Sequence, residues 1–140
     1  MPFIEIERIW TDDDEMVQLD VRISNDVQVG KQDFYIYPED LSEFGMNLQG
    51  FPKTSNDEVK LEYGEDPKYY CYFSLNALVL DGVGHSAIEV TFDNRLDPPS
   101  QAQVHFYIKC EPATINEFGR KLASWAGEMK EHFRYEWKNA

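Results

Sequence analysis

The chain has 140 residues, of which 26 are acidic and 13 basic, giving a formal net charge of −13 at neutral pH. A chain of this length is typical of one domain, and its aromatic content of 14% argues against disorder. The charge disfavours nucleic acid and anionic lipid as direct partners, because both are bound through clusters of lysine and arginine.

Residues 3–10, 16–24 and 27–37 are predicted to form three strands of a meander. The second strand alternates apolar and polar residues, as a half-buried strand does. A short helix is expected to begin at Pro38, since proline suits the first helical turn, and to end at Gly50. Residues 58–63 alternate again and predict a fourth strand.

The clearest pattern is a hairpin of residues 69–80 and 85–93 joined by Asp81-Gly82-Val83-Gly84. Glycine readily adopts the positive φ that a tight hairpin turn requires. Placing Leu80 opposite His85 gathers the apolar residues on one face, and a slip of one residue would destroy that separation. The predicted apolar face carries Phe73, Leu75, Ala77, Val79, Ser86, Ile88, Val90 and Phe92, and the polar face carries Tyr72, Ser74, Asn76, Glu89, Thr91 and Asp93.

A last strand is predicted over about residues 102–111, followed by a terminal helix. Thr114 and Glu117 have the spacing of a capping box at the start of that helix. An apolar stripe extends the predicted helix to Phe133, and the tail 135–140 is expected to fray. The expected fold class is α+β, a single domain over 1–140. It has an antiparallel meander sheet of about seven strands in the order βββ-α-ββββ-α, with the short helix and the long C-terminal amphipathic helix on one face.

Motifs of catalysis and metal binding are missing from the sequence. It has no GxSxG elbow, phosphate-binding loop, GxGxxG or EF-hand loop, and its histidines lack the spacing of a zinc pair. We therefore expect no enzyme activity, no cofactor and no metal. Cys71 and Cys110 are expected to be buried and unpaired, because the strand at residues 85–93 lies between their two strands and keeps them too far apart for a disulfide. Glu5 and Glu7 lie where a signal peptide would have a basic start and an unbroken apolar stretch, so the expected location is cytoplasmic.

Aromatic and titratable residues gather on the predicted polar sheet face. Tyrosines in an acidic setting suit a protein interface, since each offers contact area and a hydrogen bond. Cross-strand packing that stiffens the sheet is an equal alternative. His105 among carboxylates could act as a general base, although an ordinary solvated cluster is favoured. The candidate partner-binding residues are Tyr70, Tyr72, Glu89, Asp93, His105 and Tyr107.

Three segments carry a resemblance to a known family. They are residues 69–93, ending in Asp81-Gly82-Val83-Gly84-His85-Ser86-Ala87-Ile88-Glu89-Val90, the early Asp33-Phe34-Tyr35, and the following Pro38-Glu39-Asp40-Leu41. Together with the closing strand and helix, they resemble the WapI-type immunity proteins of bacterial contact-delivered toxins. The resemblance implies a cytoplasmic protein that binds and blocks one toxin domain, often a nuclease. It carries over no catalytic residue.

Two functions remain open at this point. The first is an immunity or antitoxin-like protein that binds a cognate basic toxin domain with a salt-dependent affinity. The second is a small-ligand-binding or enzymatic α+β domain that uses His105, Glu89 and Asp93 in a pocket on the open sheet face. An oligomeric structural subunit is less favoured, because the strand alternation leaves little apolar outer face. The sequence leaves open whether the acidic charge is functional or only solubilising, and it does not indicate an oligomeric state.

Overall fold

The computed structural model describes residues 1–138, which form eight strands in two antiparallel sheets and two helices. Sheet A has the order β3-β2-β1-β8 and comprises β1 (Phe3–Thr11), β2 (Val17–Ser24), β3 (Val29–Ile36) and β8 (His132–Glu136). Sheet B has the order β4-β5-β6-β7 and comprises β4 (Glu58–Tyr63), β5 (Tyr72–Val79), β6 (Ser86–Asp93) and β7 (Gln103–Cys110). The helices are α1 (Pro38–Gln49) and α2 (Pro112–Glu128). The α+β class and both meanders are confirmed.

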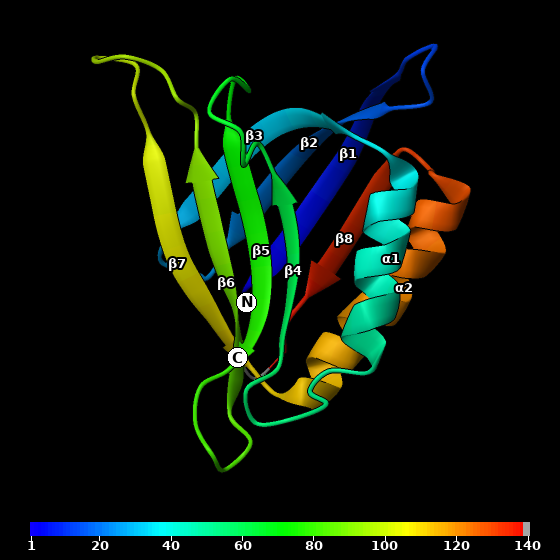
Figure 1. Ribbon diagram of the computed structural model, residues 1–140, viewed down its shortest axis with the longest axis vertical. Coiled ribbons are helices and arrows are strands. Elements are labelled where there is room, and N and C mark those ends of the chain that lie inside the picture. The colour runs from blue at the N-terminus through cyan, green and yellow to red at the C-terminus, as the bar shows by residue number, and fades with distance from the viewer. Residues whose placement is uncertain (139–140) are drawn as a thin grey trace.

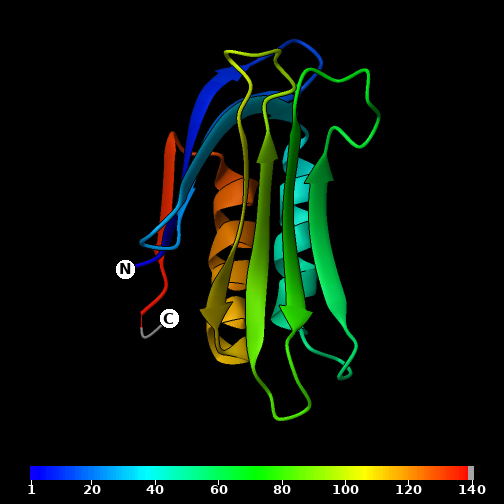
Figure 2. The same cartoon turned by 90° about the vertical axis from the view of Figure 1, so that its left-hand side faces the viewer.

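The two sheets and the helix pair enclose one apolar core. Figure 1 shows β3 and β7 on the same side of the molecule, with α1 and α2 on the opposite side, beyond β4 and β8. In Figure 2 the helices lie behind sheet B, and α1 runs beside β4. Phe34 of β3 stacks on Phe73 and Tyr63 of sheet B, with ring centroids 4.9 and 5.0 Å apart. These aromatic contacts join the sheets directly.

Glycines permit the closest approaches in this core. A Cβ atom at Gly30 of β3 would lie 2.2 Å from a ring carbon of Phe92, so the sheets can meet there only without a side chain. Gly45 of α1 and Gly119 of α2 face each other in the same way, since a Cβ at either would lie 2.6 Å from the other's carbonyl oxygen. The helix pair is therefore packed backbone against backbone. None of the helices within residues 1–138 has the length and apolar character to cross a membrane.

The hairpin between β5 and β6 adopts the predicted register. The backbone N–H of Leu80 donates to the His85 carbonyl at 2.8 Å. Phe73 pairs with Phe92, and Tyr72 pairs with Asp93, as the separation of apolar and polar residues requires. Cys71 and Cys110 are both free and buried, also as expected.

The C-terminal region differs from the sequence-based expectation. Helix α2 begins at Pro112 and ends at Glu128, where Met129 adopts a left-handed conformation with φ of 50°. The capping box does not form, because the helix begins at Pro112, ahead of Thr114, whose hydroxyl donates to the Glu111 carbonyl at 2.8 Å. Glu117 accepts a hydrogen bond from the Tyr135 hydroxyl at 2.9 Å. The chain then returns as β8 against β1, placing Phe133 in a strand.

The strands also form two sheets and not the expected single sheet. Strand β8 extends sheet A at the edge of β1, and β4, which follows helix α1, begins a separate sheet instead of pairing with β3. Tyr135 and Trp137 belong to the tail that was expected to fray, yet they are 5% and 1% exposed. The last two residues of that tail, 139–140, lie outside the described part of the chain.

Candidate binding face on sheet B

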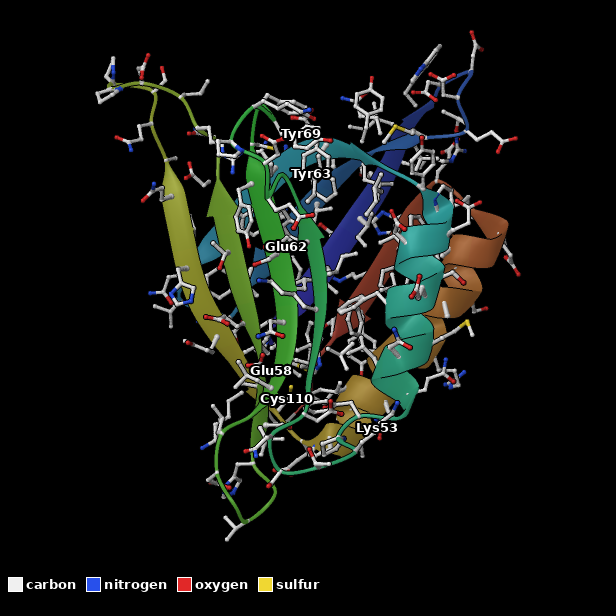
Figure 3. The ribbon with its side chains drawn as sticks, in the orientation of Figure 1. Lys53, Glu58, Glu62, Tyr63, Tyr69 and Cys110 are labelled. Atoms are coloured by element: carbon white, nitrogen blue, oxygen red, sulfur yellow. The ribbon has the colours of Figure 1, made fainter. Side chains whose placement is uncertain are left out.

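The outer face of sheet B brings together side chains from all four of its strands. Cross-strand pairing places Lys60, Asn76, Glu89 and Tyr107 side by side in one row. The next row contains Glu62, Ser74, Thr91 and His105, and the row beyond it Tyr72, Asp93 and Gln103. Glu58 and Glu62 are labelled along β4 in Figure 3. We refer to these eleven row positions as the sheet B face.

Glu89 lies on β6, an interior strand of this face, and is held by neighbouring side chains. Its Oε2 atom is 2.7 Å from Nε2 of His105 and accepts a hydrogen bond from the Tyr107 hydroxyl at 3.2 Å. The hydrogen bond from His105, with smaller contributions from Tyr107 and Asn76, lowers the pKa of the Glu89 carboxyl. Glu89 is therefore an oriented carboxylate at neutral pH.

Asp93 is oriented in a similar way one step along β6. Its Oδ1 atom accepts the backbone N–H of Arg95 at 2.8 Å, and its Oδ2 atom accepts the Gln103 side-chain amide at 3.1 Å. Both donors are electrically neutral. The carboxylate is therefore oriented without a cationic partner.

Glu62 and Tyr72 close the β4 side of the face. The Tyr72 hydroxyl donates to Glu62, and the Lys60 ammonium lies 3.2 Å from the same carboxylate. The Tyr72 hydrogen bond is the main cause that lowers the pKa of Glu62, and Lys60 adds to it. Within residues 1–138, this Lys60–Glu62 contact is the one lysine or arginine ion pair on the sheet B face.

A shallow groove of about 400 Å³ opens at the β6–β7 side of this face. His105 and Thr91 lie along it, and the Tyr72 ring forms part of its wall. Its lining is Tyr72, Thr91, Phe92, Asp93, Gln103, Val104 and His105. The groove can admit a polar group of a ligand, or a side chain of a partner protein.

Arg95, the basic residue that follows β6, holds a loop in place through hydrogen bonds of its side chain. Its guanidinium donates to the carbonyl oxygens of Asp66 and Tyr69, both at 3.0 Å, and to that of Gly64. These bonds fix the segment that leads into β5. They also occupy the guanidinium, so that it does not pair with the carboxylate of Asp93.

Five of the six partner-binding residues predicted from the sequence share the sheet B face, and the sixth does not. Tyr70 precedes β5 and its hydroxyl donates to the Asp33 carbonyl of β3 at 3.0 Å. Burial is the main cause that raises the pKa of this hydroxyl. The Tyr70 ring packs edge-on against Tyr63, which Figure 3 labels at the end of β4 near Tyr69. Tyr70 therefore lies at the junction of the two sheets.

Sequence reasoning missed the β4 contribution to this face. Lys60 and Glu62 alternate with apolar residues in the predicted fourth strand, and this alternation was the available signal. Only the pairing of β4 with β5 places them next to Asn76 and Ser74. No group of three or more histidine, cysteine or acidic side chains within residues 1–138 has the arrangement of a metal site.

No family model matches the chain, and no curated protein sequence matches it. Among solved structures, the plant transcriptional regulator PBF-2 is similar over 88% of this chain and 72% of its own, with 13% identity and a TM-score of 0.48. WHY1 from Arabidopsis thaliana is similar over 92% and 84% of the two chains, with 14% identity and a TM-score of 0.46. WHY3 from the same plant is similar over 90% and 84%, with 14% identity and a TM-score of 0.44. These likenesses are too distant to indicate a function.

Proposed function

We propose that the protein is an immunity or antitoxin-like binding protein that inhibits a basic toxin domain through the sheet B face. The observation that carries this proposal is the way in which Glu89 and Asp93 are held. Tyrosine, histidine, amide and backbone groups orient the two carboxylates, and no lysine or arginine within residues 1–138 pairs with either. Their negative charge is left for a cationic partner.

Preorganisation favours binding to such a partner. A carboxylate whose rotamer is already fixed loses less conformational entropy when an arginine or lysine approaches it. Tyr107 is 45% exposed beside Glu89 and adds an aromatic contact of the kind that interfaces use. The net charge of −13 further accelerates the encounter with a basic domain.

Inhibition follows from occupancy of a shared surface. A toxin domain that acts on nucleic acid needs basic groups to hold phosphates. An acidic face that covers those groups excludes the polyanionic substrate without any catalytic step. No residue of this chain therefore needs to perform chemistry in the proposed function.

The test uses the basic toxin domain encoded beside this protein's gene and measures affinity by calorimetry at low and high salt. We expect wild-type binding to be salt-sensitive and to rescue growth of cells that express the toxin. Glu89→Gln with Asp93→Asn should weaken binding about tenfold or more at low salt. Glu5→Gln, at the centre of the outer face of sheet A, is the matched control and should bind normally.

Two results would overturn the proposal. One is the absence of binding and rescue with the adjacent toxin domain. The other is unchanged affinity of the Glu89 and Asp93 double variant while the Glu5 control weakens binding. Far-UV circular dichroism of each variant separates loss of contact from loss of folding.

Small-ligand binding or catalysis in the groove is a second candidate, favoured by the placement of His105 at its lining. The His105–Glu89 pair is arranged as a histidine oriented by a carboxylate, which general-base chemistry uses. A fragment library screened by ligand-observed NMR tests this candidate. Fragments that bind wild-type protein but not His105→Ala would support it, and binding that is indifferent to His105 would contradict it.

A further inference from the structure

Trp10 is exposed in a way that the other two tryptophans of the chain are not. Trp10 is 58% exposed, whereas Trp125 and Trp137 are 7% and 1% exposed. Its neighbour Ile9 is 51% exposed. Two adjacent large apolar side chains in water call for a physical explanation, because isolated exposed apolar residues are common but contiguous ones mark interaction sites.

A β-bulge causes this exposure. The pairing of β1 with β2 shifts between Arg8 and Trp10, so that two residues of β1 lie opposite Gln18. In a regular strand, consecutive side chains point to opposite faces, but a bulge re-aims one of them. Ile9 and Trp10 therefore both project to solvent, rather than one of them entering the core.

Trp10 has a neighbouring strand on one side only. Strand β8 pairs with β1 only over residues 3–7, so no strand flanks Trp10 on that side. The β1–β2 hairpin consequently extends beyond the rest of sheet A, at the upper right of Figure 1. On the other side, Gln18 and then Tyr35 continue the row across β2 and β3.

A row of three carboxylates lies immediately beside this aromatic row. Glu7, Asp20 and Asp33 are opposite one another on β1, β2 and β3. Like charges in directly opposed positions destabilise a sheet. Lys31 offsets the charge of Asp20 at 3.4 Å, and the Gln18 amide donates to Asp33 at 3.1 Å. Within residues 1–138, Glu7 and Asp33 have no lysine or arginine partner.

The hairpin loop adds further negative charge. Asp13, Asp14 and Glu15 are all exposed at the turn that follows Trp10. Asp12 holds this turn, because its carboxylate accepts the backbone N–H groups of Asp14 and Met16 at 2.9 and 3.0 Å. An apolar anchor thus stands between two acidic groups on an ordered hairpin.

We propose that this hairpin-tip patch is a docking surface for a basic protein segment that offers an apolar pocket to Trp10. The patch consists of Ile9, Trp10 and Tyr35 with Glu7, Asp13, Asp14, Glu15 and Asp33. It lies on sheet A, away from the sheet B face, and does not depend on the function proposed for that face. Charge complementarity selects the occupant: an anionic bilayer and a second copy of this chain both carry charge of the same sign.

The test selects a phage-displayed random peptide library on immobilised wild-type protein, with counter-selection on Trp10→Ala. We expect enriched peptides that combine lysine or arginine with apolar residues. Synthetic copies should bind wild type, shift the fluorescence of Trp10, and lose about tenfold or more in affinity with Trp10→Ala. Trp10→Phe should retain most of the affinity, since it keeps an aromatic anchor.

Two controls keep the test specific to the patch. Val83→Ala removes an even more exposed apolar side chain on the β5–β6 turn, 79% exposed, and should leave peptide binding unchanged. Glu7→Gln with Asp33→Asn should lower the affinity and flatten its salt dependence while Trp10 remains in place.

The proposal is overturned if no enriched peptide depends on Trp10, or if the dependent peptides are acidic. Sedimentation that shows a concentration-dependent dimer abolished by Trp10→Ala would assign the patch to a second copy instead. Binding to vesicles of phosphatidylcholine, with or without phosphatidylglycerol, would assign it to a membrane. The peptide result also stands apart from toxin binding, because Glu89→Gln should leave it unaffected.

Discussion

Glu5 and Glu89 occupy comparable positions in the two sheets, but their carboxylates interact with different groups. Each lies on an interior strand, with its side chain on the outer face. Glu5 lies 2.6 Å from Arg134 and 3.7 Å from Arg22. Glu89 is held instead by His105 and Tyr107. The first carboxylate is neutralised within the molecule, whereas the second remains available to a partner.

The difference arises from the origin of the neighbouring strands. Arg134 reaches Glu5 on β8, from the far end of the chain. The neighbours of Glu89 come from β5 and β7, which adjoin β6 in sequence, and they supply hydroxyl, imidazole and amide groups. A carboxylate on an interior strand can thus be paired with an arginine of the same molecule or lack such a partner, according to which strand lies beside it.

The largest expected effect comes from removing the core contact of Trp137, the residue that directly follows β8. Trp137 is 1% exposed and packs on Phe118 with ring centroids 5.0 Å apart. Trp137→Ala should destabilise the fold by about 3–5 kcal/mol, because it empties a large site in the core. Urea unfolding measures this change. A loss below about 1 kcal/mol would show that β8 is not an integral part of sheet A.

A substitution between the two helices should cause the next largest loss of stability, because the helix pair packs against the core that both sheets share. Gly119→Ala introduces a methyl group 2.6 Å from the Gly45 carbonyl and 2.5 Å from Leu48 Cβ. We expect a destabilisation of about 1–3 kcal/mol from this overpacking. Gly127→Ala is the control: it lies in the same helix with no atom within 4 Å of the added methyl, and should stabilise by up to about 1 kcal/mol. Equal effects at the two positions would contradict the close contact.

Substitution of Glu89, the carboxylate without an arginine partner, should have a smaller effect that depends on pH. Hydrogen bonds from His105 and Tyr107 lower the folded-state pKa of Glu89 below its ordinary value of 4.5. Its contribution to stability is therefore complete above that ordinary pKa and is lost as the pH falls through the lower folded-state value. Glu89→Gln should cost about 1 kcal/mol at neutral pH and reduce the loss of stability on acidification. Parallel unfolding curves of the two proteins from neutral to acidic pH would count against this.

The ion pair of Glu5 with Arg134 should have the smallest effect on stability. A double-mutant cycle of Glu5→Gln and Arg134→Gln should give a coupling energy of about 0.2–1 kcal/mol, since the pair is partly exposed. High salt should reduce this coupling. A coupling above about 2 kcal/mol would mean that the ion pair is a main stabilising element of sheet A.

Local patterns predicted the elements that are formed by neighbouring segments. The hairpin of β5 and β6 was predictable with its register, because a slip of one residue would expose Phe73 and Val90. The start of α1 at Pro38 follows from the same kind of local rule. Most of the sheet B face followed from these patterns, apart from the β4 residues and the displaced position of Tyr70.

The terminal strand shows where such patterns are ambiguous. Met129 and Phe133 continue the helical spacing of α2, but Phe133, Tyr135 and Trp137 also alternate as a strand does. The second pattern prevails because β1 offers an unoccupied edge whose backbone groups need partners. That edge exists only in the folded molecule, so no local rule could favour it.

The sequence by itself determined the α+β class, the two meanders and the separation of apolar from polar sheet faces, because these depend on residue spacing within single elements. It also determined the large negative charge. Tertiary structure alone decided which carboxylates lack a lysine or arginine partner, because long-range pairing brings Arg134 to Glu5 and leaves Glu89 beside the His105 imidazole and the Tyr107 hydroxyl. The acidic composition thus became a specific surface only when the strands were assembled.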